Sequence, residues 1–239
     1  MSAQTNPPTN PLSNTLRAVL WDMDGTLIDS HEYHWLAWRD TLAAEGFTLT
    51  HAQFDSTFGQ RNDTILRATF GPDFPLSEVD RIGGIKETHY RDRVRSRGIA
   101  PLPGVMRWLD RLKADGWRQA IASAAPRLNI ETILDVLHLT DRFDAIASAE
   151  DVQRGKPDPQ VYLVAAERVG AHPSQCIVVE DAPAGIEGAR RAGMRAVGLL
   201  TSHTALPADI VVRSMDELPD DAFEKLIRET PAPAARAQA

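Results

Sequence analysis

The sequence contains a single cysteine, Cys176, among its 239 residues. One cysteine excludes a disulfide framework within the chain. It stands in the apolar run Cys176-Ile177-Val178-Val179, which favours a small buried side chain over a reactive thiol.

Long apolar runs and excess positive charge are also lacking. No apolar run is long enough to span a membrane, so we expect no membrane partner. The net charge is −7 and there is no long basic run. This argues against nucleic acid as a partner, because binding a phosphate backbone needs a concentrated positive surface. A basic pocket for a small anion remains compatible with this composition.

The first fourteen residues have neither a cationic flank nor an apolar stretch, so they do not resemble a signal peptide. We therefore expect a cytoplasmic protein. Residues 1–14 and 231–239 are rich in Pro, Asn, Ser, Thr or Ala and are predicted to be flexible tails. The rest has the apolar and charged content of a globular protein, 43% and 25%. The oligomeric state is left open.

Short apolar runs alternate with amphipathic helical patterns along most of the chain. Runs of this kind, separated by helices, are typical of buried parallel strands. The sequence therefore predicts an α/β fold, a doubly wound and mostly parallel Rossmann-like sheet. The runs are 18–21, 119–122, 145–147, 177–179, 196–199 and 210–212.

One interval interrupts this alternation. Almost a hundred residues between the first run and the second contain no convincing strand and show helical patterns instead, about 30–44, 51–58, 63–70 and 76–97. Asp29 and Glu32 have the spacing of a capping box for the first of these helices. We predict an α-helical cap domain, residues 32–100, inserted into a catalytic core formed by 15–31 and 101–230.

Polar residues follow the predicted strands where each strand ends. Because ligands bind beyond the carboxyl ends of parallel strands, these residues are expected to share one site. Four are carboxylates, one is a hydroxyl and one is a lysine: Asp22, Asp24, Ser123, Lys156, Glu180 and Asp181.

The charges of this set indicate a cation. Four carboxylates and a phosphate dianion would total about −6, which Coulomb repulsion forbids without positive charge. Mg²⁺, Lys156 and a proton on Asp24 would bring the total to about −2. Mg²⁺ prefers one or two carboxylates together with phosphate oxygens and waters, so we predict a magnesium site.

Two neighbouring carboxylates in different surroundings can hold different protonation states. Asp22 is therefore predicted to be the nucleophile and Asp24 the general acid and base, with an aspartyl-phosphate intermediate. Alone, the Asp-x-Asp-Gly pattern of residues 22–25 is also typical of a turn or a metal-binding loop. Its place directly after a buried strand, followed in order by the serine, lysine and acidic pair, favours the catalytic interpretation.

These motifs resemble the four signatures of the haloacid dehalogenase superfamily. Residues 21–30, Trp-Asp-Met-Asp-Gly-Thr-Leu-Ile-Asp-Ser, resemble the first signature, and Ile-Ala-Ser at 121–123 the second. Gly-Lys-Pro-Asp-Pro at 155–159 resembles the third. Val-Glu-Asp at 179–181, with Ala-Gly-Ile at 184–186, resembles the fourth. Within this superfamily, the sequence resembles the branch that contains β-phosphoglucomutase and sugar-phosphate phosphatases.

The resemblance implies a Rossmann-like core with a helical cap. It also implies Mg²⁺ held by Asp22, the backbone carbonyl of Asp24 and Asp181, with Glu180 close to the metal. Ser123 and Lys156 would bind the transferring phosphate. Dehalogenation is not expected, because members with that activity lack an acid equivalent to Asp24.

Three residues of the predicted cap resemble residues of the sugar-phosphate mutases. His34 matches a histidine that couples cap closure to proton transfer, Arg61 a phosphate-binding arginine, and Lys86 a cap lysine. Each has an ordinary alternative: a solvated helix histidine for His34 and surface charges for the other two.

The predicted function is a Mg²⁺-dependent phosphatase of small phosphorylated metabolites, including sugar phosphates. A β-phosphoglucomutase-like phosphomutase is the alternative, although Ser-Ala-Ala-Pro-Arg at 123–127 lacks the Ser-Ala-Ser-Lys-Asn-like segment of the known mutases. A third interpretation is a metabolite-binding protein that has lost its catalytic activity. The sequence does not name the substrate.

Overall fold

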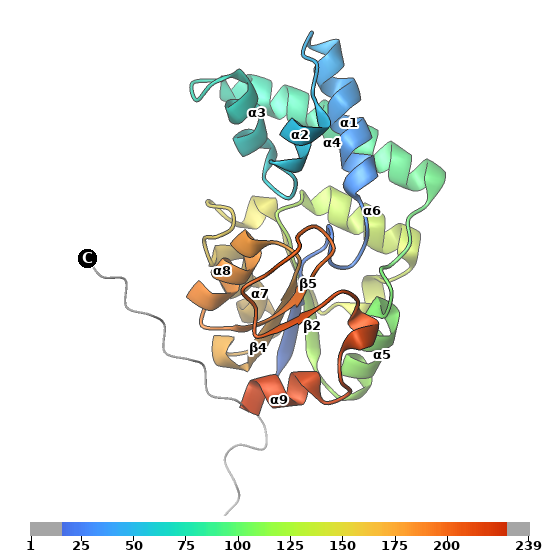
Figure 1. Cartoon of the computed structure of the whole chain (residues 1–239), viewed down its shortest axis with the longest axis vertical. Coiled ribbons are helices and arrows are strands. Elements are labelled where there is room, and N and C mark those ends of the chain that lie inside the picture. The colour runs from blue at the N-terminus through green and yellow to red at the C-terminus, as the bar shows by residue number, and fades with distance from the viewer. Residues whose placement is uncertain (1–15, 229–239) are drawn as a thin grey trace, which may run out of the picture.

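The computed structural model describes residues 16–228 and contains a six-stranded parallel sheet (Figure 1). The strand order, β3-β2-β1-β4-β5-β6, is that of the doubly wound Rossmann fold. The predicted fold class is therefore confirmed. The strands are β1 (Ala18–Trp21), β2 (Arg118–Ala122), β3 (Ala145–Ala147), β4 (Cys176–Glu180), β5 (Arg195–Leu199) and β6 (Ile210–Val212).

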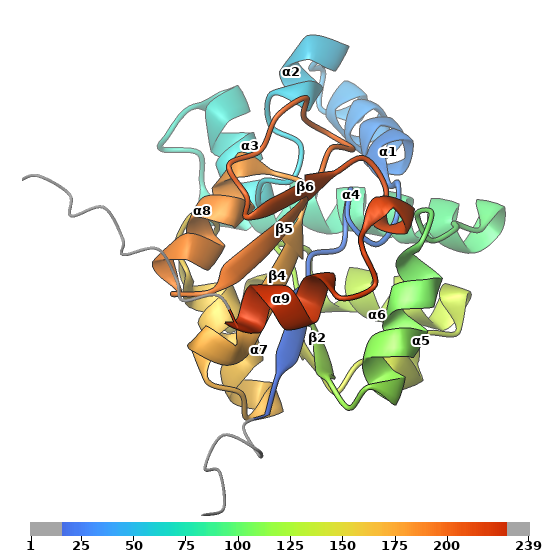
Figure 2. The same cartoon turned by 60° about the horizontal axis from the view of Figure 1, so that its bottom comes forward.

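The central strands are buried on both faces because their side chains alternate between two apolar clusters. Val19 and Trp21 of β1 face one cluster, while Ala18 and Leu20 face the other. The first cluster is covered by α5 (Val105–Ala114), α6 (Arg127–Leu137) and α9 (Ala222–Arg228), and the second by α7 (Gln160–Val169) and α8 (Pro183–Arg191). Figure 2 shows α9 lying across the strands near α5. The described part of the chain also contains the short 3₁₀ helices η1 (Thr140–Arg142), η2 (Ala149–Asp151), η3 (Pro173–Gln175) and η4 (Met215–Glu217).

Four helices between β1 and β2 form a separate layer at one end of the sheet (Figure 1). They are α1 (His31–Ala44), α2 (His51–Asp55), α3 (Asn62–Phe70) and α4 (Leu76–Arg97), and we call them the helical unit. Most of their buried apolar side chains form a third cluster, which includes the predicted stripe of Trp35, Trp38 and Leu42. The domain limits at residues 32 and 100 stay predictions.

All six predicted strands are present, and α4 has the predicted bounds. The second helix is shorter than expected, because α2 ends at Asp55. The capping box at Asp29 and Glu32 was wrong: Ser30 is the N-cap of α1, and its side chain makes no cap hydrogen bond. The Ser30 hydroxyl instead donates to Asp24, so its hydrogen-bonding capacity is used by the site.

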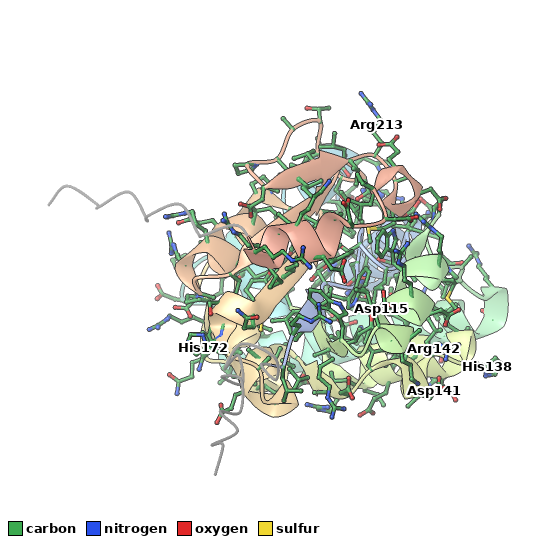
Figure 3. The ribbon with its side chains drawn as sticks, turned by 90° about the horizontal axis from the view of Figure 1, so that it is seen from below. Asp115, His138, Asp141, Arg142, His172 and Arg213 are labelled. Carbon is green, nitrogen blue, oxygen red and sulfur yellow. The ribbon has the colours of Figure 1, made fainter. Side chains whose placement is uncertain are left out.

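Charged and polar side chains lie at the opposite end of the sheet. Asp115, Asp141, Arg142 and His172 lie there, on the side away from the helical unit (Figure 3).

Within residues 16–228, no helix combines the length and apolar character needed to cross a bilayer. The predicted tails 1–14 and 231–239 lie outside the described residues.

Candidate active site

A cavity of about 1610 Å³ lies at the carboxyl ends of the strands and is lined by the sheet loops and the helical unit. Its position is the one expected for ligand binding in an open parallel sheet. The structure brings all nine predicted site residues to its lining: Asp22, Asp24, His34, Arg61, Lys86, Ser123, Lys156, Glu180 and Asp181.

Asp22 is fixed by the strand pairing that precedes it. Its backbone N–H donates to the Val179 carbonyl, which extends the pairing of β1 with β4 by one residue. The Lys156 ammonium donates to Asp22 Oδ1 at 2.5 Å, and both side chains are only 9% exposed. Burial nevertheless raises the pKa of Asp22 well above its usual value, since desolvation and the neighbouring carboxylates outweigh the attraction of Lys156.

Glu180 holds the lysine from the other side. Its Oε1 accepts from Lys156 Nζ at 2.5 Å and from the Tyr162 hydroxyl at 3.1 Å, while Oε2 accepts the backbone N–H groups of Asp181 and Ala182. A Cβ at Gly185 would lie 1.9 Å from Glu180 Oε1, so only glycine leaves room for this carboxylate at the start of α8. Glu180 therefore acts in this structure mainly as the fixed partner of Lys156.

Asp22, Glu180 and Asp181 bring one carboxylate oxygen each within 4.8 Å of one another. Burial, followed by the charge of Glu180, raises the pKa of Asp181 to about 7. Three buried carboxylates with one lysine carry unmatched negative charge, and all-oxygen donors suit a hard divalent cation such as Mg²⁺. The residues thus fit the predicted metal. The Asp24 side chain is not in this cluster.

Asp24 is turned towards the helical unit. The Ser30 hydroxyl donates to its Oδ1 at 2.5 Å, and His34 Nε2 lies 3.3 Å from the same oxygen. Burial favours the protonated form, but the positive charge of the His34–Lys86 pair and the hydrogen bonds from His34 and Ser30 lower the pKa of Asp24 below its usual value in the ligand-free chain. The expected proton on Asp24 belongs to the phosphate-bound site and stays a prediction.

His34 and Lys86 form a pair rather than two solvated charges. Lys86 Nζ lies 2.8 Å from His34 Nδ1, and the His34 ring stacks on Tyr90 with centroids 4.1 Å apart. Lys86 is only 2% exposed. A lysine ammonium has no acceptor, so Nδ1 must accept its hydrogen and Nε2 must carry the hydrogen that faces Asp24.

Ser123 follows β2, and its backbone N–H donates to the Ala147 carbonyl, extending the pairing with β3. Its buried Oγ accepts the N–H of Ala125. That contact leaves the hydroxyl hydrogen to donate into the cavity, as phosphate binding requires.

Arg61 has contacts that the sequence did not suggest. Its guanidinium donates to Asp63 and to the carbonyls of Ala149 and Val152, so it joins the start of α3 to the loop before Lys156. A Cβ on Gly155 would lie 3.1 Å from the Arg61 side chain. Its role in phosphate binding stays a prediction.

Sequence reasoning missed several residues that hold the site together. Ser30 was assigned to a helix start and Tyr162 to no role. Glu87 and Asn129, which join the helical unit to α6, were overlooked because they are polar residues inside amphipathic helices. The sequence does contain one indication for Glu87, because it directly follows Lys86, a predicted site residue.

The four signature segments meet in one cavity, and a family model agrees with them. The model of haloacid dehalogenase-like hydrolases matches residues 16–193. The chain belongs to the haloacid dehalogenase-like hydrolase family. Within this family it is 33% identical over 220 residues to β-phosphoglucomutase from Bacillus subtilis strain 168, a match covering 85% of this chain and 92% of the relative.

Hexitol phosphatase B from Escherichia coli strain K12 is 32% identical over 214 residues, covering 84% of this chain and 93% of that protein. Among solved structures, β-phosphoglucomutase from Clostridium difficile superposes with a TM-score of 0.77 at 27% identity, covering 89% of this chain and 97% of that chain. Relatives in this haloacid dehalogenase-like branch thus include both a named phosphatase and named phosphomutases.

Proposed function

We propose that this chain is a Mg²⁺-dependent phosphatase of small phosphorylated metabolites, sugar phosphates among them. The observation that carries the proposal is Asp22, buried at the end of β1, held by Lys156 and placed in one cavity with Ser123 and Asp24. Among the relatives, hexitol phosphatase B supports a phosphorylated small molecule as substrate. A cytoplasmic location and the identity of the metal are parts of the same proposal.

In the first step, an Asp22 oxygen attacks phosphorus and forms an aspartyl-phosphate, while the bond from phosphorus to the ester oxygen breaks. Asp24 donates its proton to the leaving oxygen. Because the ligand-free chain favours the Asp24 carboxylate, the proton must be taken up when a phosphate dianion enters and raises the proton affinity beside it. Lys156 and Ser123 bind the phosphate oxygens throughout.

In the second step, the Asp24 carboxylate accepts a proton from water as the water oxygen attacks phosphorus. The bond from phosphorus to Asp22 breaks, and inorganic phosphate leaves. Asp22, Asp181 and the Asp24 carbonyl would hold Mg²⁺, which supplies positive charge to the phosphate oxygens. Catalysis then consists mainly of positioning and charge neutralisation.

A phosphomutase is the second candidate, and the contact of Lys86 with His34 beside Asp24 favours it. The segment after Ser123 supports hydrolysis instead. Arg127 pairs with Asp151 and the Ile146 carbonyl, so this segment brings no further cation to the cavity lining. A sugar hydroxyl is then held less firmly beside the aspartyl-phosphate. Water therefore competes more effectively as the group that attacks phosphorus.

We therefore expect phosphate release to exceed isomerisation. With Mg²⁺, β-glucose 1-phosphate and a trace of the 1,6-bisphosphate, phosphorus NMR will show inorganic phosphate appearing faster than glucose 6-phosphate. A parallel screen of phosphorylated metabolites for phosphate release will define the substrate class. Rapid glucose 6-phosphate formation with almost no phosphate, abolished in His34→Ala, would make the phosphomutase the correct function.

A further inference from the structure

A buried carboxylate, Glu87, links the helical unit to the core. It lies on α4, is only 5% exposed, and accepts from three donors. Asn62 Nδ2 and Lys86 Nζ donate to Oε1 at 2.8 and 2.9 Å, and Asn129 Nδ2 donates to Oε2 at 2.5 Å. Asn129 belongs to α6 of the core, so one carboxylate ties three elements together.

The orientation of the Asn129 amide follows from its second contact. Arg91 donates to Asn129 Oδ1 at 2.9 Å, and a guanidinium has only donors. The amide oxygen must therefore face Arg91, and the amide nitrogen must face Glu87. Asn129 is 1% exposed, so water does not readily replace either contact.

Hydrogen bonds continue from Glu87 to the proposed acid and base. Lys86 lies between Glu87 and His34, and His34 lies between Lys86 and Asp24. This series of hydrogen bonds therefore runs from the core helix α6 through the helical unit and back to the end of β1. Breaking the contact at Asn129 removes the donor that holds Oε2 of the carboxylate beside Lys86.

We propose that Glu87 is a positioning residue whose contact with Asn129 couples the seating of the helical unit on α6 to the placement of His34 against Asp24. Asn129 can hold Glu87 only when α4 lies on α6. Glu87 then keeps Lys86 against His34 Nδ1. As a result, the hydrogen on His34 Nε2 faces Asp24. The kinetic part of this inference rests on the proposed phosphatase function. The structural part does not.

Nitrogen NMR of labelled histidine tests the structural part without any turnover. In the wild type, the neutral His34 ring will be the Nε2–H tautomer. In Glu87→Gln, which keeps the side-chain size, and in Asn129→Asp, which sets a carboxylate against Glu87, a mixture of tautomers is expected. Thr132→Val is the matched control, because it removes the Arg95 to Thr132 contact between the same two helices without touching Glu87. Unchanged His34 signals in both test variants would overturn the proposal.

Two substrates test the kinetic part. An alkyl phosphate needs a proton on its leaving oxygen, whereas p-nitrophenyl phosphate releases an anion that needs none. We expect Glu87→Gln and Asn129→Asp to lower kcat/KM, which reports the cleavage of the ester, by about 30-fold for the alkyl ester and far less for the aryl ester. This is a fraction of the roughly 10²–10⁴-fold that a general acid contributes, because Asp24 itself remains. Thr132→Val will retain wild-type rates with both.

The double variant Glu87→Gln with Asn129→Asp reverses the direction of the bond between α4 and α6. An amide at position 87 donates to a carboxylate at 129, and its oxygen still accepts from Lys86. Recovery of the alkyl phosphate rate relative to Asn129→Asp is expected. Equal slowing of both esters, or no recovery, would show a merely structural contact. A wild type that releases no phosphate but shows the predicted His34 response would refute the phosphatase and leave the coupling intact.

Discussion

Asp22→Asn will fold normally and lose phosphate release by about 10⁴-fold or more, an effect of the size seen when a catalytic group is removed. An amide is a poor nucleophile and a weaker metal ligand than a carboxylate. Folding is expected to survive because the substitution removes one negative charge from a buried cluster in which the pKa of Asp22 is already raised by burial. Steady-state phosphate release and thermal unfolding measure the two effects.

The matched control for this variant is Asp115→Asn, at the opposite end of the sheet (Figure 3). Its side chain contacts Arg111 and lies far from the cavity lining. Wild-type turnover is expected there. A well-folded Asp22→Asn protein with turnover close to that of the control would exclude Asp22 as the nucleophile.

Removal of divalent cations will abolish phosphate release, and Mg²⁺ will restore it. Ca²⁺ will restore it poorly, because its longer and less directional bonds misplace the phosphate. Mg²⁺ will also raise the melting temperature without substrate, since it neutralises the buried carboxylates of Asp22, Glu180 and Asp181. At 100 times its Kd, the gain in unfolding free energy is about 2.7 kcal/mol.

Asp181→Asn provides the corresponding variant. It removes a ligand whose pKa is raised to about 7 by burial and by Glu180, so the Mg²⁺-dependent rise in melting temperature should shrink strongly. The substitution itself should not unfold the chain, because an amide costs less to bury than an unmatched carboxylate. Full turnover after chelation, or an equal Mg²⁺ shift in this variant, would contradict the metal assignment.

The sheet and the core of the site could be predicted because both follow from short-range patterns. Apolar runs of four or five residues mark buried parallel strands, and the carboxyl ends of such strands converge on one edge. That convergence is enough to bring Asp22, Ser123, Lys156 and Asp181 together. The resemblance to the family signatures then implies roles for Ser123, Lys156 and Asp181, whereas the predicted role of Asp22 follows from its place beside Asp24 at the end of a buried strand.

Contacts across the cavity could not be predicted in the same way. Glu87 and Asn129 are 42 residues apart in sequence and meet only because α4 packs on α6. Arg61 was expected at the phosphate, yet its donors reach backbone carbonyls of a distant loop. Helical periodicity indicates which face of a helix is apolar, but it does not say which other helix lies against a polar side chain.

The ionisation of Asp24 shows the same limit. A charge count over the acidic residues assigns it a proton, because it treats all four carboxylates as one cluster. The structure turns the Asp24 side chain away from the other three, towards Ser30 and His34, and those donors stabilise the carboxylate. The direction of the Asp24 side chain therefore sets which donors it meets in the ligand-free chain, and the residue types alone do not show that direction.

The aspartyl-phosphate at Asp22 is the central claim, and the stereochemistry at phosphorus tests it most directly. Each in-line displacement inverts phosphorus, so attack by Asp22 followed by attack by water gives two inversions. Hydrolysis of an isotopically chiral phosphorothioate ester in isotopically labelled water is therefore expected to proceed with net retention of configuration. Net inversion would mean that water attacks the ester directly, and it would contradict a covalent intermediate on Asp22.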